Sequence, residues 1–264
     1  MRFEKWQALG NDYLIVEAAG LDPERVRALC DRHRGVGADG VLALAPPDEP
    51  GFVARLRIYN PDGSEAELSG NGARQALLYL RERGWTEART YSIQTLAGEI
   101  RATITGERSC RTDMGRASLR SDHFPSGPPD GRGVVAGRRF QHVQIGNPQC
   151  AIHVADREEL EALDLPAIGP PIEHADLFPA RTNVSFWTAL APDRIRARIF
   201  ERGVGETMSS GTGACGAAVA HVLRGGDSAV VVELDGGELT VDVDESLHVD
   251  LEGWAVPVFR GELS

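Results

Sequence analysis

The stretch Ser69-Gly70-Asn71-Gly72-Ala73-Arg74 returns in the second half of the chain as Ser210-Gly211-Thr212-Gly213-Ala214-Cys215. Each copy joins a small hydroxyl residue and two glycines to an apolar segment that is typical of a helix. This pattern predicts a helix N-terminus whose backbone N–H groups, together with the helix dipole, bind anions. Two copies in matched surroundings predict two similar lobes, each offering a helix end to one ligand.

The segments around each copy predict strands and turns. Alternating and apolar runs flank both helices, and the turns Gly10-Asn11-Asp12 and Gly146-Asn147-Pro148 follow the first strand of each half. Residues 106–133, rich in Gly, Pro and Arg, predict a linker, and a second Pro-rich stretch runs to Pro179. We therefore expect an α+β fold of two similar lobes, each a mostly antiparallel sheet around a central helix.

Composition excludes several classes of protein. The chain has 264 residues, 42% of them hydrophobic and 25% charged, which is typical of a folded globular protein. A net charge of −11 argues against a nucleic-acid partner, since phosphate binding needs a basic surface. No apolar run reaches the roughly 20 residues that span a bilayer, and the N-terminus has no signal-peptide pattern. We expect a cytoplasmic protein that does not bind membranes.

The cysteines and the single lysine argue against disulfides, a metal site and one common cofactor. Cys30, Cys110, Cys150 and Cys215 show no paired spacing, so the sequence predicts neither a disulfide framework nor a metal site. Lys5 is the only lysine and lies in a predicted strand with no phosphate cradle beside it. Pyridoxal phosphate needs a pocket lysine for its Schiff base, so we do not expect that cofactor.

Eight short motifs together resemble the diaminopimelate epimerase family along essentially the whole chain. In order they are Gly10-Asn11-Asp12-Tyr13, Asp31-Arg32 with Gly35-Val36-Gly37-Ala38-Asp39-Gly40, Asn60-Pro61-Asp62-Gly63-Ser64-Glu65, Gly70-Asn71-Gly72-Ala73-Arg74, Gly146-Asn147-Pro148, Asn183-Val184, Glu201-Arg202-Gly203-Val204-Gly205-Glu206-Thr207 and Gly211-Thr212-Gly213-Ala214. The resemblance implies a cofactor-independent and metal-independent epimerase that inverts L,L- to meso-diaminopimelate in lysine and cell-wall precursor synthesis.

The same resemblance sets the expected lobes and partners. It implies that the final strand returns to the first lobe, giving an N-terminal lobe of residues 1–112 joined by about 255–264 and a C-terminal lobe of residues 113–254. The expected partner is a small diamino dicarboxylate substrate. The sequence does not determine an oligomeric state, and a homodimer is retained as an expectation.

The resemblance also implies which residues act on the substrate. The family uses two cysteines, one at the start of each glycine motif, to take a proton from one face of the α-carbon and return one to the other. This chain has Ser69 and Ser210 there, and Gln149 replaces a histidine that assists the first cysteine. Glu201 could serve Ser210 as a base. The implied binding residues are Asn11, Asn60, Gly70, Asn71, Asn147, Asn183, Glu201, Arg202, Gly211 and Thr212.

The replacement of thiols by hydroxyls carries a large expected penalty. A cysteine thiol has a pKa near ~8.5, and a helix N-terminus lowers it, whereas an alkoxide is several units harder to form. At about 1.4 kcal/mol per unit, the expected loss is on the order of 5 kcal/mol or more, which is several powers of ten in rate. By themselves, Ser69 and Ser210 are also ordinary helix caps.

Three functions therefore remain open from the sequence. The first is an epimerase working slowly through its serines. The second is a non-catalytic diamino-acid-binding relative, or a deliberately inactivated form of the enzyme. The third is an isomerase that uses Glu201 as a single base for a one-sided proton shift.

Overall fold

The computed structural model describes residues 1–66 and 68–263. The chain divides into two compact units. Unit 1 comprises Met1–Asp113 and Gly253–Ser264, and unit 2 comprises Met114–Glu252.

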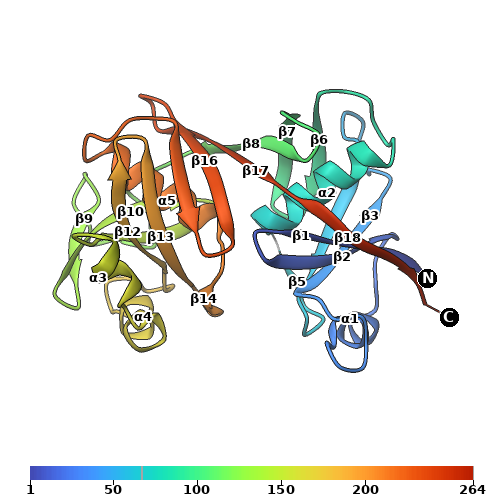
Figure 1. The fold of residues 1–264 in the computed structure, drawn as a ribbon, viewed down its shortest axis with the longest axis horizontal. Coiled ribbons are helices and arrows are strands. Elements are labelled where there is room, and N and C mark those ends of the chain that lie inside the picture. Colours follow the sequence, from blue (N-terminus) through green and yellow to red (C-terminus); the bar gives the residue numbers. More distant parts are fainter. Residues whose placement is uncertain (67, 264) are drawn as a thin grey trace. The chain divides into compact units, whose positions relative to one another are not determined.

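Unit 1 is a mixed sheet with two helices (Figure 1). Its strands are β1 (Arg2–Ala8), β2 (Asn11–Glu17), β3 (Gly40–Ala45), β4 (Arg55–Tyr59), β5 (Glu65–Ala66), β6 (Thr90–Thr95), β7 (Gly98–Ile104), β8 (Ser109–Arg116) and β18 (Val256–Glu262), and its helices are α1 (Pro23–Cys30) and α2 (Gly70–Glu82). β18, β1 and β2 pair antiparallel, β2 and β3 parallel, and β3 and β4 antiparallel. β4 then pairs antiparallel with β5 and parallel with β6, and β6, β7 and β8 continue antiparallel.

Unit 2 repeats this plan strand for strand. Its elements are β9 (Arg132–Val135), β10 (Arg138–Ile145), β11 (Asn147–His153), α3 (Arg157–Glu161), α4 (Leu165–Glu173), β12 (Asn183–Ala191), β13 (Arg194–Glu201), β14 (Gly205–Thr207), α5 (Gly211–Val222), β15 (Val230–Leu234), β16 (Gly237–Val243) and β17 (His248–Trp254). β9, β10 and β11 pair antiparallel, β11 and β12 parallel, and β12, β13 and β14 antiparallel. β13 pairs parallel with β15, and β16 and β17 follow antiparallel. The expected α+β duplication is confirmed, with parallel pairs inserted at the same two places in each unit.

The strand registers define equivalent positions in the two units. Asn11 and Asn147 begin β2 and β11, so Tyr13 is equivalent to Gln149. β3 pairs with β4 through Val41 and Tyr59, as β12 pairs with β13 through Val184 and Phe200. The residues that follow Tyr59 and Phe200, Asn60 and Glu201, are therefore equivalent. The helices α2 and α5 both begin one residue after a capping serine.

Each unit packs its sheet against one buried helix. α2 contacts β1, β2, β3, β4 and β7, and α5 contacts β10, β11, β12, β13, β15 and β16 (Figure 1). α5 is buried from Gly211 to His221, which its small side chains permit. A Cβ atom at Gly216 would lie 2.7 Å from the Cβ of Gln149, so glycine is required where the helix meets β11.

Two stretches contain more regular structure than their composition indicates. Residues 106–133 are not simply a linker, because β8 occupies Ser109–Arg116, Ser118 bridges to Gln144, and β9 begins at Arg132. The Pro-rich stretch before Pro179 contains α4, which Asp164 caps by accepting from the N–H of Ala167. Pro166 lies in the first turn, where its missing N–H has no intrahelical partner, whereas Pro170 and Pro171 lie inside the helix. None of the helices in the described residues is long and apolar enough to cross a membrane.

Candidate active site

Ser69 lies at the N-terminus of α2 with an extended backbone (φ −137°, ψ 117°). Its Oγ accepts a hydrogen bond from the N–H of Gly72 at 3.1 Å and another from the Tyr13 hydroxyl at 3.1 Å. Both bonds use the lone pairs of Oγ, so the hydroxyl proton of Ser69 remains available to a ligand. Two donors on one oxygen also favour its deprotonated form.

Asn11 is held by an ionic network that the Asp31–Gly40 motif supplies. Its Nδ2 donates to Asp39 at 2.8 Å, and its backbone carbonyl accepts from Gln75 of α2 at 3.0 Å. Arg32 bridges Asp39 at 2.7 Å and Asp12 at 2.8 Å. This motif therefore fixes the strand end that carries Asn11.

Asp12 is the ionic centre of that network. Lys5 lies 2.6 Å from it and also donates to the carbonyl of Gly37 at 2.7 Å. Burial alone would raise the pKa of Asp12, but hydrogen bonds from Arg32 and Lys5 hold it at about 2. Gly37 has φ +79° and a Cβ there would lie 2.9 Å from the Cα of Arg32, so only glycine fits this turn.

The other predicted residues of unit 1 divide into two places. Asn71 is buried in the first turn of α2, after Gly70, and its Oδ1 accepts from Arg74 at 2.5 Å. Arg74 in turn donates to the carbonyl of Trp254 at 3.0 Å. Asn60 lies in the turn after β4, where its side chain donates to Ser64 at 3.0 Å. Asn60 is thus held by its own turn.

Ser210 caps α5 with nearly the same backbone (φ −142°, ψ 124°) and accepts from the N–H of Gly213 at 3.3 Å. Its hydroxyl donates to Glu201 at 3.1 Å, and Thr207 donates to the other carboxylate oxygen at 2.9 Å. Burial raises the pKa of Glu201 above its ordinary value, which the two hydroxyl hydrogen bonds partly oppose. Unit 2 therefore places a base directly against its serine.

Gln149 is fully buried in β11 against α5. Its Nε2 contacts the carbonyl of Asn147 at 3.5 Å, and its Oε1 has no hydrogen-bond partner among the described residues. Gln149 belongs to unit 2, whereas Ser69, the residue that it was expected to assist, belongs to unit 1.

Asn183 fixes the loop that carries Arg202. Its Oδ1 accepts from the backbone N–H of Arg202 at 2.8 Å, and its Nδ2 donates to the carbonyl of Pro148 at 3.2 Å. The buried Glu173 accepts from the N–H of Gly203 at 2.9 Å and so holds the same loop. The guanidinium of Arg202 donates to the carbonyl of Ala180 at 3.0 Å and has no acidic partner in the described part of the chain. A carboxylate ligand would supply one.

The remaining predicted residues of unit 2 lie around the start of α5. Gly211 and Thr212 form its first turn and are buried. Gly146, which precedes Asn147, lies close to the methyl group of Thr212, since a Cβ there would be 3.5 Å from it. Unit 2 thus gathers Ser210, Thr212, Asn147 and Glu201 near one helix end.

Two contacts were missed by the sequence analysis. Tyr13 was quoted only as part of a motif, yet it bonds Ser69, and Thr207 bonds Glu201. Tyr13 begins a run of four buried β2 residues, Tyr13 to Val16, and therefore resembles an ordinary core tyrosine in sequence. All four cysteines are buried and lie outside any disulfide of the described residues, and burial raises the pKa of Cys150 well above its ordinary value, so Cys150 is a poor substitute for a catalytic thiol.

The family model described as diaminopimelate epimerase matches residues 3–120 and 141–254. The chain belongs to the diaminopimelate epimerase family. Its membership places it among the amino-acid epimerases and racemases, a group of isomerases.

Relatives of the family match the chain over almost its full length. A diaminopimelate epimerase of Pelotomaculum thermopropionicum is 42% identical, covering 99% of this chain and 98% of that protein. One from Synechococcus sp. is 41% identical, covering 99% and 97%.

Solved structures at lower identity share the fold. A PhzF-family phenazine biosynthesis protein of Bacillus anthracis has a TM-score of 0.70 at 19% identity, covering 100% of this chain and 99% of that one. A hydroxyproline epimerase of Agrobacterium vitis has a TM-score of 0.67 at 16% identity, covering 99% and 91%.

Proposed function

We propose that the chain inverts L,L-diaminopimelate to meso-diaminopimelate without a cofactor, with Ser69 and Ser210 as its proton-transferring groups. Family membership supports the reaction, and the placement of each serine at a helix N-terminus supports their roles. The first-turn N–H groups of both helices suit an α-carboxylate, and Arg202 suits the distal one.

The hydrogen-bond directions assign different tasks to the two serines. Ser210 donates to Glu201, so the Ser210 oxygen can take the α-proton while its own proton passes to the carboxylate. Ser69 accepts from Tyr13 and Gly72, so its hydroxyl proton is free for the opposite face of the α-carbon. One proton is taken and one returned, and solvent restores both groups.

A second candidate is one-sided proton exchange at the α-carbon. The observation that favours it is the pairing of a carboxylate with Ser210 alone, since the phenol of Tyr13 is a poor base at neutral pH. In that case the protein would bind the diamino acid and exchange its α-proton without inverting the centre.

One incubation distinguishes these functions. Pure L,L-diaminopimelate is incubated with the protein in deuterated water and analysed by mass spectrometry and chiral chromatography. Inversion with deuterium at the new centre supports the epimerase, whereas exchange with retention supports the one-base enzyme. Binding without either outcome would contradict both and leave a non-catalytic binding protein.

A further inference from the structure

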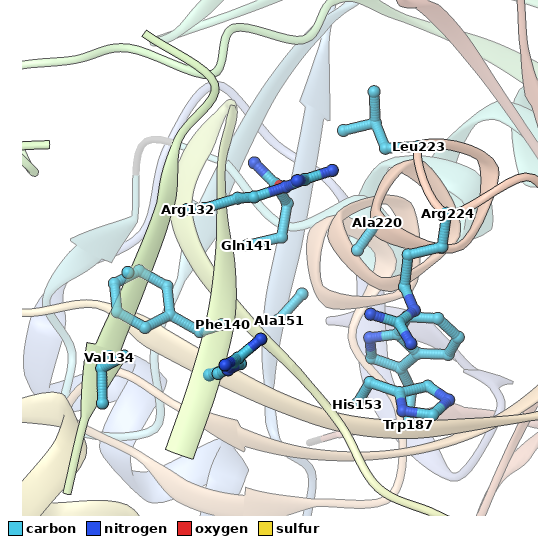
Figure 2. A pocket seen from close by; sticks show the side chains of 12 residues that line it. Arg132, Val134, Phe140, Gln141, Ala151, His153, Trp187, Ala220, Leu223 and Arg224 are labelled. Carbon is cyan, nitrogen blue, oxygen red and sulfur yellow. The ribbon is translucent and has the colours of Figure 1, made fainter. Parts of the chain in front are cut away.

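A cavity of about 650 Å³ opens in unit 2 at the C-terminal end of α5, the end opposite Ser210. β9, β10, β11, β12 and the end of α5 line it. Figure 2 shows Arg132, Val134 and Phe140 on one side and His153, Trp187 and Arg224 on the other. A neighbouring cavity of about 420 Å³ shares His153, Trp187 and Arg224 with it. The mouth of a curled sheet is a common place for a ligand.

The charges on this cavity are positive in an otherwise acidic protein. Arg132, Arg139 and Arg224 line it and are exposed. Arg132 has a loose ion pair with Asp130 at 3.8 Å, in which both side chains are more than half exposed. Arg139 and Arg224 have no acidic partner among residues 1–66 and 68–263. With a net charge of −11, the chain has acidic residues in excess, yet these two arginines remain unmatched.

Unit 1 carries the same three arginines at equivalent positions, and there each has an acidic partner. In unit 1, β1 and β18 pair Glu4 with Arg260 and Arg2 with Glu262. In unit 2, β10 and β9 pair Gln141 with Arg132 and Arg139 with Val134. Arg132 is therefore equivalent to Arg260, and Arg139 to Arg2. Arg83 follows α2 as Arg224 follows α5. In unit 1, Arg83 lies 2.6 Å and Arg260 3.2 Å from Glu4, and Arg2 lies 3.6 Å from Glu262.

Every acid of this unit 1 arrangement is replaced in unit 2. The replacements are Gln141 for Glu4, His153 for Glu17, Leu223 for Glu82 and Val134 for Glu262. The side chain that fills unit 1 is lost as well, because Ala220 stands where unit 1 has Tyr79. Tyr79 packs edge-on against Trp6 at 6.1 Å and donates to Glu17 at 2.9 Å. Unit 2 therefore keeps the three arginines but lacks both the acidic residues and the tyrosine that occupies this space in unit 1.

The walls of the cavity add a donor and apolar surface. Trp187 is 1% exposed, and its buried Nε1 has no hydrogen-bond partner among the described residues. A buried donor without a partner is costly. Burial lowers the pKa of the neighbouring His153, as does the positive charge of Arg224. Phe140, Leu223 and Ala151 supply an apolar surface.

We propose that this cavity is a second binding site, for a small organic anion that carries two or more negative charges on a flat, apolar body. Arg132, Arg139 and Arg224 would bind the charged head, as guanidinium groups bind carboxylate and phosphate. Trp187, Phe140 and Leu223 would contact the body. Helix stabilisation explains part of the pattern, since a cation such as Arg224 suits a helix C-terminus. It does not explain Arg132 and Arg139, which come from the sheet.

The test uses isothermal titration calorimetry with the full chain. The probes are adenosine monophosphate, phthalate, inorganic phosphate and uncharged adenosine. Adenosine monophosphate and phthalate compare a phosphate with a carboxylate as the charged group. Inorganic phosphate and adenosine test the charged group and the organic body separately. We expect adenosine monophosphate or phthalate to bind with a submillimolar Kd, and inorganic phosphate and adenosine to bind at least tenfold more weakly. Binding of inorganic phosphate as tightly as the best organic anion would overturn the proposal.

Matched variants locate the site. Arg139→Ala should weaken binding at least tenfold, whereas Arg2→Ala, its equivalent in unit 1, should leave the Kd unchanged. Leu223→Glu restores an acid that unit 1 has and should also abolish binding, with the thermal unfolding midpoint measured to confirm folding. No binding of either organic anion at 5 mM probe, on the order of the weakest useful affinity, would overturn the proposal. So would equal effects of Arg139→Ala and Arg2→Ala.

Discussion

The two serine-capped helix ends have the same backbone and different chemistry. Ser69 and Ser210 share extended dihedral angles, and each accepts from the N–H three residues later. Ser69, however, accepts a hydrogen bond from a phenol, whereas Ser210 donates one to a carboxylate. The same hydroxyl is thus arranged to give a proton in unit 1 and to take one in unit 2.

The partners of the two serines come from different strands. Tyr13 lies on β2 and bonds Ser69, whereas its equivalent Gln149 on β11 contacts the carbonyl of Asn147. Glu201 ends β13, and its equivalent Asn60 bonds Ser64 instead of Ser69. A duplicated backbone therefore fixes where the serines lie, while two unrelated side chains decide what each can do.

The largest expected effect comes from replacing both serines by cysteine. Ser69→Cys combined with Ser210→Cys should raise the rate of inversion by on the order of 10³-fold or more, because helix N-termini favour thiolates over thiols. Chiral chromatography of diaminopimelate measures the rate. Ser69→Ala with Ser210→Ala is the control for folding and binding and should not invert at all. A double cysteine variant that binds the substrate and remains inactive would argue that the lineage has another substrate.

The next largest effect distinguishes the two residues that bond the serines, Glu201 and Tyr13. Glu201→Gln keeps the shape of the carboxylate and removes the base, so α-proton exchange in deuterated water should fall by on the order of 10²-fold. Tyr13→Phe removes the hydroxyl beside Ser69 and should lower exchange less, since a hydrogen-bond donor is lost but no base. Equal losses would show that the two ends are chemically equivalent.

Arg202 tests a charge that only unit 2 carries, because its equivalent in unit 1 is Pro61. Arg202→Ala should weaken diaminopimelate binding by roughly 2–4 kcal/mol, since a carboxylate would lose a charged partner. Calorimetry measures the change, and Arg181→Ala serves as a control on the same surface. Unchanged affinity would remove Arg202 from the binding site.

The smallest effect concerns stability. Unit 1 holds Asn11 through an ionic network around Asp12, whereas unit 2 holds the Arg202 loop through hydrogen bonds to Asn183 and Glu173. Folding lowers the pKa of Asp12 from 3.8 to about 2, so its contribution is present above pH ~4 and is lost as the pH falls through about 2. Asp12→Asn should reduce the free energy of unfolding by about 2 kcal/mol at pH 7, with no difference below pH ~2. Urea titration measures this, and Asp48→Asn, in a half-exposed pair with Arg55, should lose under ~1 kcal/mol.

The duplication could be predicted from the sequence because turns and helix caps depend on a few neighbouring residues. The capping positions of Ser69 and Ser210 were readable from short motifs. The strand β8 was missed because glycine and arginine near residue 106 resemble a linker, while its pairing with β7 depends on residues elsewhere in the chain. The helix α4 was missed because prolines usually mark breaks.

The contacts around the serines were less predictable than their positions. The Ser69–Tyr13 bond joins residues 56 apart, and no local rule connects them. The bond from Ser210 to Glu201 spans only nine residues, and its possibility was visible in the sequence. The cavity of unit 2 was not visible at all, because it depends on comparing equivalent residues that only the strand registers identify.

The single cysteine variants test the inequality of the two ends most directly. Because Ser210 already has Glu201 as its base, Ser69→Cys alone should raise inversion at least tenfold more than Ser210→Cys alone, although both should remain well below the double variant. Initial rates with L,L-diaminopimelate at saturation give the comparison. Equal gains, or a larger gain from Ser210→Cys, would contradict the account.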